Sequence, residues 1–475
     1  MTNQTLFERF RDKRCTVIGL GKSNFAVIAF LVAHGAKVVA RDAKERDALR
    51  ASLGEILDRL ENTGVRLRCG KGYLDGLDEE IIFRTPAVMP WLPEIEAAVA
   101  RGATLTSEME LFMELTPARV IGITGSDGKT TTTTLTGLML EEECKRRGSG
   151  RVFVGGNIGT PLLPWVEAMR NDDFAVVELS SFQLQTMTRS PERAAMTNIS
   201  VNHLNWHTDM GEYVGAKTNI YRHEPNCLFV TNGQNETTQR LAAECGREVT
   251  LFFGEGEGYG KKRVFLKDGV ICFGDGDAVT EILPVEKILL PGKHNVENYM
   301  TAIALTEGLV SRESILAVAT TFKGVKHRLE VIDEIDGVTY YNSSIDSTPT
   351  RTAAALSALA PKRPIVICGG YDKKTPYEPL AESLCRHAKA VVLTGASAPL
   401  IKAALEQTDA VKTGVLPVYE DGDFEKAIHL AKRAAEKGDI VLLSPACASF
   451  DAFANFEERG DRFRQIVKTF HQERN

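Results

Sequence analysis

The stretch that decides the fold is a glycine-rich turn that runs into a threonine-rich helix start: Gly125-Ser126-Asp127-Gly128-Lys129-Thr130-Thr131. It follows the apolar run 119–124, which is typical of a buried strand, and precedes a helical pattern that ends at Arg147-Gly148. Backbone N–H groups at a helix N-terminus and a lysine attract phosphate, and a threonine hydroxyl suits Mg²⁺. Ile123 stands where the usual pattern has its first glycine, so the loop is a variant. The alternative is a chance glycine turn before a helix; we predict that these residues bind ATP.

The length and charge of the chain limit what else it does. Its 475 residues predict about three domains, and 43% hydrophobic with 25% charged residues is ordinary for a globular protein. The net charge of −6 argues against nucleic-acid or membrane partners. The sequence shows no signal-like or membrane-spanning apolar run, and its nine cysteines lack metal-binding spacing. We therefore expect a cytoplasmic monomer with reduced thiols that acts on small molecules.

Residues 1–115 have the pattern of half a Rossmann-type unit. Gly19-Leu20-Gly21 lies between an expected strand and helix, and Asp42 ends the following strand. Asn24 stands at the third glycine of the dinucleotide fingerprint, which leaves open whether the turn accepts a dinucleotide or another nucleotide. An expected helix at 108–115 would close this first domain.

Strands and helices continue to alternate along the rest of the chain. Residues 116–323 contain the glycine-rich turn 125–131, which we call the phosphate loop, and further strands. The glycine-rich part 248–290 predicts a small antiparallel addition with a hairpin turn at Asp268-Gly269. Residues 324–475 contain short apolar runs separated by helical periods, which predict a parallel sheet. The predicted fold class is α/β, with three domains.

Two side chains at expected strand ends are candidates for metal binding. Glu178 ends the apolar strand 174–178, and with Thr130 it could hold the Mg²⁺ that bridges ATP phosphates. The alternative role for Glu178 is to cap the next helix. His203 follows the strand 195–201, and both a structural role and a metal or phosphate role are open for it.

Lys217 is the most unusual candidate. A helix over 212–224 places it on an otherwise apolar stripe with Tyr213 and Ile220. Burial would lower the pKa of the lysine and leave some neutral amine, which can react with CO₂ to give a metal-binding carbamate. The alternative is a lysine whose ammonium reaches solvent along the helix surface.

Further polar residues fall near the second domain junction. Asn295 and Asn298 lie one turn apart at an expected helix start, where amides can cap the helix or contact an adenine edge. His327-Arg328 follows the junction, and Arg328 could reach ATP when the third domain closes.

Taken together, these motifs resemble the Mur ligase superfamily, over nearly the whole chain. The C-terminal stretches resemble the branch that adds D-glutamate. The matching motifs are Gly19–Gly21, Gly122–Thr130, Gly156–Gly159, Glu178–Gln183, Thr197–Ile199 with His203, Lys217, His294-Asn295 with Asn298, His327-Arg328, Leu443–Asp451 and Asn455–Gly460.

The resemblance implies a Rossmann-like domain for a UDP substrate, a central P-loop ATPase domain and a Rossmann-like domain for the amino acid. It implies that two Mg²⁺ ions are bound and that Lys217 is carbamylated. The implied UDP-substrate residues are Ser23, Asp42, Asn157, Ser180 and Gln183, with Asn157 near the reacting carboxylate. The implied ATP-binding residues are Gly125 to Thr131, Asn295, Asn298 and Arg328. The implied metal ligands are Thr130, Glu178, His203 and Lys217; Lys129, His203, Lys217 and Asn157 are the implied catalytic residues. The implied D-glutamate residues are Ser347, Lys373, Ser449 and Phe456.

One segment departs from the family pattern. Ser343 stands where an acid is expected near the nucleotide, and Ile345 stands where a lysine is expected near the phosphates. Those two contacts are therefore not carried over, and Asp346 is a candidate replacement for the acid. Ala87 also stands where the first domain usually has a glycine.

The activity that the resemblance implies is ATP-dependent addition of D-glutamate to UDP-N-acetylmuramoyl-L-alanine, through an acyl phosphate, in peptidoglycan precursor synthesis. Rival hypotheses are a Mur-type ligase for another amino acid, a folylpolyglutamate synthase-like enzyme and a subunit that works with a glutamine amidotransferase. An NAD-dependent dehydrogenase and a non-catalytic nucleotide-binding module are hypotheses from other classes.

Overall fold

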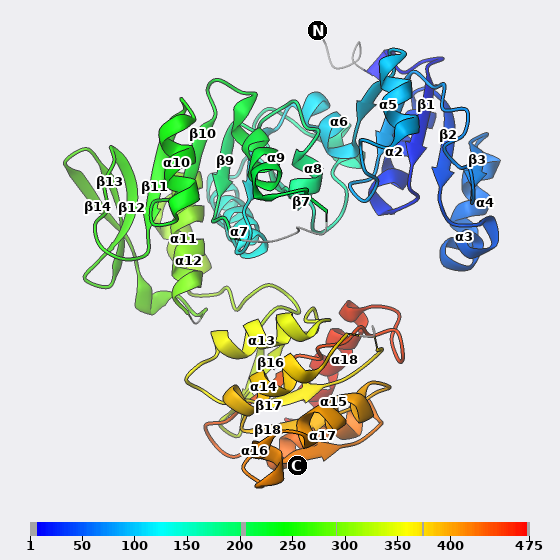
Figure 1. The fold of residues 1–475 in the computed structure, drawn as a ribbon. Helices are drawn as coiled ribbons and strands as arrows, with labels where there is room; N and C mark the ends of the chain where they lie inside the picture. Colours follow the sequence, from blue (N-terminus) through cyan, green and yellow to red (C-terminus); the bar gives the residue numbers. More distant parts are fainter. Residues whose placement is uncertain (1–6, 201–205, 291, 373–374, 473–475) are drawn as a thin grey trace. The chain divides into compact units, whose positions relative to one another are not determined.

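The computed structural model describes residues 7–200, 206–290, 292–372 and 375–472. These residues form three sheets with helices packed around them (Figure 1). The chain divides into two compact units: the first runs to Thr320, and the second comprises Thr321 onward with the short stretch Leu289–Gly292. No helix of the described residues is long and apolar enough to cross a membrane. The predicted α/β fold class is confirmed.

The first sheet is parallel and has the strand order β3-β2-β1-β4-β5. Its central strand is buried from Cys15 to Ile18, as expected where helices cover both faces. The strands are β1 (Arg14–Ile18), β2 (Lys37–Asp42), β3 (Arg66–Cys69), β4 (Ile81–Arg84) and β5 (Thr104–Thr106); the helices are α2 (Lys22–Ala33), α3 (Arg46–Leu53), α4 (Glu55–Asn62), α5 (Pro93–Ala100) and α6 (Glu108–Leu115).

The second sheet follows in the same unit and has the order β14-β13-β12-β11-β10-β9-β6-β8-β7. It is parallel from β7 to β12. Helices α11 and α12 each pack on α7, and α8 packs on α9. The strands are β6 (Arg119–Thr124), β7 (Val152–Gly156), β8 (Phe174–Glu178), β9 (Arg193–Met196), β10 (Leu228–Asn232), β11 (Glu248–Phe253), β12 (Lys262–Lys267), β13 (Val270–Asp275) and β14 (Ala278–Pro284). The helices are α7 (Lys129–Arg147), α8 (Ser181–Leu184), α9 (Met210–Arg222), α10 (Glu236–Glu244), α11 (Lys293–Thr306) and α12 (Arg312–Ala319), with short 3₁₀ turns η1 (Leu163–Ala168) and η2 (Val285–Lys287).

The predicted antiparallel addition is confirmed for β12 to β14, whereas β11, at the start of the predicted range 248–290, is a parallel strand of the main sheet. Strands β12 and β13 form a hairpin, and Asp268 and Gly269 at its turn both have positive φ, which suits a tight two-residue connection. Strand β12 pairs in parallel with β11, so the hairpin continues the second sheet at the end away from β7 (Figure 1). The sequence pattern gave no sign of this, because strand pairing is a tertiary property.

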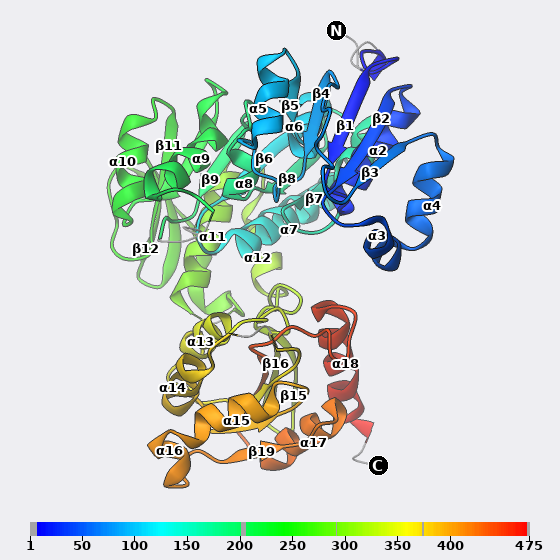
Figure 2. The same cartoon turned by 45° about the vertical axis from the view of Figure 1, so that its right-hand side comes forward.

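The third sheet lies in the second unit, with the order β15-β16-β20-β17-β18-β19. Only β15 is antiparallel to its neighbour. Alternate residues of β17 face opposite layers: Val366 packs with α13 and α14, and Ile367 packs with α17 and α18 (Figure 2). The strands are β15 (Glu330–Ile335), β16 (Val338–Asn342), β17 (Ile365–Cys368), β18 (Ala390–Leu393), β19 (Val418–Glu420) and β20 (Ile440–Leu443); the helices are α13 (Pro349–Ala358), α14 (Glu378–His387), α15 (Ala398–Glu406), α16 (Asp409–Lys412), α17 (Phe424–Ala434) and α18 (Phe456–Thr469).

Candidate functional site

The turn between β6 and α7 requires glycine at two positions. Gly125 has φ +142° and Gly128 has φ +77°, which is backbone that other residues rarely adopt. A Cβ at residue 125 would collide with Thr197 Oγ1, and one at residue 128 would collide with Asn298 Oδ1. The turn is thus held between β9 and α11, and its backbone opens onto the N-terminus of a 19-residue helix. That is the geometry of an anion site.

The other residues of this turn are fixed by the segment after β9. The hydroxyl of Ser126 lies 2.9 Å from Tyr213 OH and accepts a hydrogen bond from Ser200 N at 2.9 Å. Asp127 N donates to Asn198 Oδ1 at 2.9 Å. Ser126 therefore stabilises the turn through these hydrogen bonds, in addition to the contact with phosphate that the sequence predicts for it.

Lys129 begins α7 with its side chain folded over the turn. Its Nζ donates to the carbonyls of Gly125 and Ser126, at 3.0 Å each. The ammonium therefore lies against the first two residues of the loop, so a phosphate bound there would contact both a cation and backbone N–H groups.

A carboxylate, a hydroxyl and an amide meet at the ends of three neighbouring elements. Thr130 Oγ1 donates to one oxygen of Glu178 at 2.7 Å, and Asn157 Nδ2 donates to the other at 2.8 Å. The backbone N of Asn157 also donates to Glu178 O. The alternative that Glu178 caps the next helix is wrong, because the side chain of Ser180 caps α8.

Lys217 is buried on α9, with 2% of its surface exposed. Its Nζ donates to Gly125 O at 2.9 Å and Thr124 Oγ1 at 3.1 Å, and it lies 4.8 Å from the ring centre of Tyr213. Burial, and after it the charge of Lys129, lowers the pKa of Lys217 well below its ordinary value. The alternative of a solvent-reaching lysine is therefore wrong, and the predicted apolar stripe is confirmed.

The two predicted asparagines lie against the phosphate loop. Asn298 Oδ1 accepts from Thr132 Oγ1 at 3.3 Å, and its amide donates to Asn295 Oδ1 at 3.1 Å. Helix α11 begins at Lys293, so both lie inside it and neither precedes it as a cap. Thr131, in the first turn of α7, is buried.

Ser180 and Gln183 satisfy each other in a capping box. Gln183 N donates to Ser180 Oγ at 3.3 Å, and Ser180 N donates to Gln183 Oε1 at 3.0 Å. Their position just after Glu178 keeps them beside the site, but the pair already has a structural function in α8.

The glycine turn after β1 is ordered by polar side chains. Asp42 accepts from Leu20 N at 2.8 Å, and Ser23 lies half-buried in the first turn of α2. Asn24, at the third fingerprint position, is buried and donates to Ile18 O and Gly19 O at 2.9 and 2.8 Å. The side chain of Asn24 thus stands at the position where a dinucleotide fingerprint has its third glycine, which allows the helix to pack closely on the strand.

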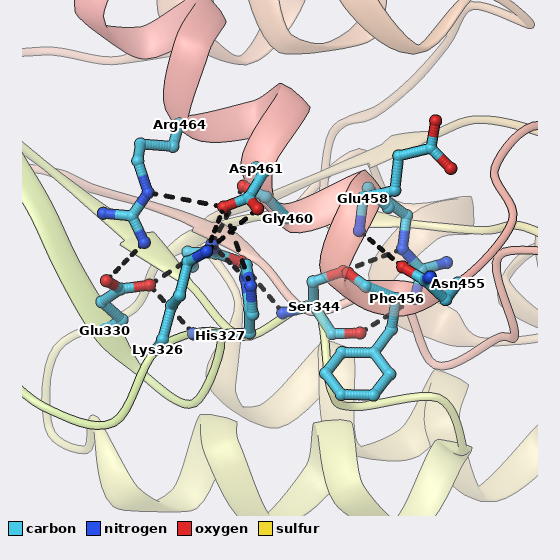
Figure 3. Close-up of polar contacts among 12 residues, drawn as sticks. Lys326, His327, Glu330, Ser344, Asn455, Phe456, Glu458, Gly460, Asp461 and Arg464 are labelled. Atoms are coloured by element: carbon cyan, nitrogen blue, oxygen red, sulfur yellow. Dashed lines mark hydrogen bonds and ion pairs between the residues drawn. The ribbon is translucent and has the colours of Figure 1, made fainter. Parts of the chain in front are cut away.

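The predicted amino-acid residues belong to separate segments of the second unit. Ser449 is buried and follows β20, Phe456 begins α18, and Ser347 lies in the loop before α13. The ring of Phe456 stands edge-on to His327, 6.0 Å away between centres, and its carbonyl accepts from Ser344 Oγ at 2.8 Å. Figure 3 shows this contact beside the ion pairs of Lys326 with Asp461 and of Arg464 with Glu330. Lys373 and His203 lie outside the described residues.

The atypical loop after β16 contains a buried acid. Asp346 accepts from Ser444 Oγ at 2.9 Å, and burial raises the pKa of Asp346 to about 6. Ser343, in place of the expected acid, accepts from Leu329 N at 3.1 Å. Arg328 precedes Leu329 in this unit, and its approach to ATP stays a prediction.

Sequence reasoning missed the burial of three arginines, Arg41, Arg84 and Arg459, which are 0%, 1% and 2% exposed. Arg84 is the last residue of β4 and donates to Val88 O, Phe182 O and Thr186 Oγ1, so it connects the loop after β4 to the α8 region. Arg459 lies on the same face of α18 as Phe463 and Ile466. A basic residue in an apolar stripe was the signal that singled out Lys217, and it would have found Arg459.

Among the described residues, no three His, Cys, Asp or Glu side chains gather into a group that could hold a metal by themselves. The polar side chains that converge are those of the phosphate loop with Glu178, Asn157 and Lys217.

Comparison with known proteins identifies the family. The Mur ligase middle domain matches residues 123–306, and the Mur ligase, glutamate ligase domain matches residues 327–447. UDP-N-acetylmuramoylalanine–D-glutamate ligase of Acetivibrio thermocellus is 43% identical, over 97% of this chain and 97% of its own. The enzyme of that name from Clostridium perfringens is 45% identical over 97% of both. The structure of MurF ligase from Thermotoga maritima in complex with ADP shares the fold, with a TM-score of 0.55 at 17% identity over 99% of this chain and 97% of its own. The resemblance drawn from the motifs is confirmed, and the chain belongs to the Mur ligase family.

Proposed function

We propose that this chain is an ATP-dependent ligase that joins D-glutamate to UDP-N-acetylmuramoyl-L-alanine, releasing ADP and phosphate in peptidoglycan precursor synthesis. The observation that carries the proposal is the convergence of Thr130, Asn157 and Glu178 beside the phosphate loop, with buried Lys217 at its base. The relatives that are 43–45% identical over nearly the full length carry the name of this activity.

The donor set fits Mg²⁺. Glu178 and Thr130 offer a carboxylate and a hydroxyl 2.7 Å apart, and hard oxygen ligands are those that Mg²⁺ prefers. A first ion would be held by these two residues and a second by His203 and Lys217. Bound there, the ions would neutralise the phosphate charges of ATP.

Lys217 fits a metal ligand only after its cationic amine is converted. Neutral amine and CO₂ form a carbamate with loss of a proton, and burial of the side chain favours the neutral amine. We propose that Lys217 is carbamylated, which turns a buried cation into a carboxylate-like group.

The reaction must bring a carboxylate to a triphosphate, so repulsion between anions is the main barrier. The alanyl carboxylate attacks the γ-phosphorus, ADP leaves, and an acyl phosphate forms. The amine of D-glutamate then attacks the acyl carbon, loses a proton, and inorganic phosphate leaves. Lys129 and the loop N–H groups hold the phosphates, and Asn157 orients the substrate carboxylate. Closure of the amino-acid domain would exclude water from the acyl phosphate.

The remaining assignments extend this proposal. Domains would span 1–115, 116–323 and 324–475. Ser23, Asp42, Ser180 and Gln183 would contact the UDP substrate, and Asn295, Asn298 and Arg328 would contact ATP. Ser347, Lys373, Ser449 and Phe456 would surround D-glutamate. We propose a cytoplasmic monomer, which size-exclusion chromatography would test.

The proposal is tested by measuring phosphate release with Mg²⁺, ATP, UDP-N-acetylmuramoyl-L-alanine and a panel of amino acids. We expect release that depends on D-glutamate, and a loss of at least ~10²-fold in Lys129→Ala. Lys145→Ala is the matched control, because Lys145 is an exposed lysine of the same helix. Dependence on another amino acid or on a folate substrate would instead support one of the rival ligases.

A further inference from the structure

Arg459 is a buried cation whose hydrogen-bond partners in the described part of the chain include no carboxylate. Its side chain is 2% exposed, in the first turn of α18. Nε donates to Ser344 Oγ at 3.0 Å, and Nη2 donates to Ser344 O at 2.9 Å. The other bonds, each 3.1 Å long, go from Nη1 to Cys447 O and Ala448 O and from Nη2 to Cys447 O. The five bonds end on four described acceptors, three backbone carbonyl oxygens and one hydroxyl oxygen.

These bonds join the chain segments that contain the predicted D-glutamate residues. Ser344 belongs to the loop of Ser347, and Cys447 and Ala448 directly precede Ser449. Arg459 itself lies one helical turn after Phe456. Ala448 O also accepts from Tyr371 N at 2.9 Å, which attaches the segment before Lys373. One guanidinium therefore holds together segments that are far apart in the sequence.

Two acids near Arg459, Asp451 and Asp346, favour its charged form, but among the described residues neither is hydrogen-bonded to it. Asp346 is bonded to Ser444 Oγ, and Asp451 accepts from Ala396 N at 3.1 Å. Burial lowers the pKa of Arg459 to about 10, so the side chain stays protonated at neutral pH. By contrast Arg41, which is also fully buried, donates to both oxygens of Glu79 at 2.9 and 3.1 Å. A buried charge without such a partner is costly unless something else compensates it.

We propose that Arg459 is a positioning residue whose buried charge is compensated by the amino-acid substrate, so that it selects a substrate with a second carboxylate. The inference rests on the proposed function and deepens it. Through its five bonds Arg459 also sets the spacing between the Ser347, Ser449 and Phe456 segments. The selected class is a dicarboxylic amino acid in preference to its neutral side-chain amide.

The test compares kcat/KM for D-glutamate and D-glutamine, which differ in charge and hardly in shape. In Arg459→Gln we expect the preference for D-glutamate to fall at least tenfold, while the KM for ATP stays within twofold. In Arg459→Lys we expect the preference to persist at pH 7 and to fall at pH 9. The reason is that a buried lysine has a lowered pKa, whereas the wild-type arginine stays charged. Arg462→Gln, which changes an exposed arginine of the same helix, should leave the preference unchanged.

An unchanged preference in Arg459→Gln, or the same preference at both pH values in Arg459→Lys, would overturn the inference and leave Arg459 a purely structural residue. Should Arg459→Gln fail to fold, as judged by its circular dichroism, the pH comparison in Arg459→Lys decides alone. Failure of the proposed function is distinguishable, because wild-type protein would then form no amide with D-glutamate. If the wild type is active with D-glutamate and Arg459→Gln keeps the same preference, only the proposed role of Arg459 is wrong.

Discussion

The phosphate loop of the first unit and the amino-acid region of the second unit are both proposed to bind anions, but they are built differently. The loop is one contiguous stretch, 125–131, that runs directly into the N-terminus of α7. The amino-acid region is assembled from distant segments that Arg459 joins. A contiguous site depends on local backbone conformation, and an assembled site depends on tertiary packing. Their responses to substitution should therefore differ.

The largest effect is expected from a substitution beside the phosphate loop of the first unit. Lys217→Ala should lower kcat by ~10²–10³-fold at ordinary Mg²⁺, because it removes the group proposed to become a metal-binding carbamate. Steady-state phosphate release measures this, with thermal unfolding as a check on folding. Lys145→Ala serves as the control. Near-normal kcat in Lys217→Ala would remove the carbamate from the mechanism.

Gly128→Ala should weaken ATP binding and destabilise the first unit. Residue 128 has φ +77°, and its new Cβ would meet Asn298, so we expect a loss of ~1–3 kcal/mol in the free energy of unfolding. Gly215→Ala in α9 is the matched control: nothing lies within 4 Å of its Cβ, and the free energy should rise by up to ~1 kcal/mol. Nucleotide titration and denaturant unfolding measure both, and equal effects would contradict the strained-loop explanation.

Asp346→Asn tests the amino-acid region of the second unit through the pH dependence of its stability. Burial raises the pKa of Asp346 to about 6, above its value in the unfolded chain. Its contribution to stability is therefore fully present below about pH 4 and is lost as the pH rises through about 6. The wild type should lose on the order of 3 kcal/mol across this window from this group, and the asparagine variant should not.

Hydrogen exchange of the β20 amides measures this locally, because the three tryptophans, Trp91, Trp165 and Trp206, all lie in the first unit. Glu108→Gln is the control: it removes another buried acid, whose pKa burial raises to about 7, from the first unit. The same pH dependence of β20 exchange in Asp346→Asn and wild type would contradict the assignment.

The smallest expected effect concerns Ser180. Ser180→Ala removes the side-chain half of the α8 capping box and should cost ~1 kcal/mol of stability. Ser180→Thr keeps a hydroxyl and should cost less. Denaturant unfolding gives the stability, and the KM for the UDP substrate in the same variants sharpens the comparison. An unchanged KM would restrict Ser180 to capping.

The contiguous features could be predicted because the signal and the structure have the same local cause. The left-handed backbone at Gly125 and Gly128 and the burial of Lys217 on its helical stripe both follow from residue type and spacing. The Asp268-Gly269 hairpin was predicted for the same reason. Its attachment to the second sheet was not, since periodicity does not identify a strand's neighbour.

The sequence by itself determined the α/β class, the phosphate loop, the buried lysine and the family. Only the tertiary structure decided that Glu178 meets Thr130 and Asn157 and that Asn24 fills the turn after β1. It also decided that Arg459 holds Ser344, Cys447 and Ala448 together without a carboxylate. The physical reason is range. Backbone conformation and helical faces are fixed by residues a few positions apart, whereas the bonds of Glu178 to Asn157 and Thr130 and of Arg459 to Ser344 join residues 21, 48 and 115 positions apart and exist only once the sheets have formed.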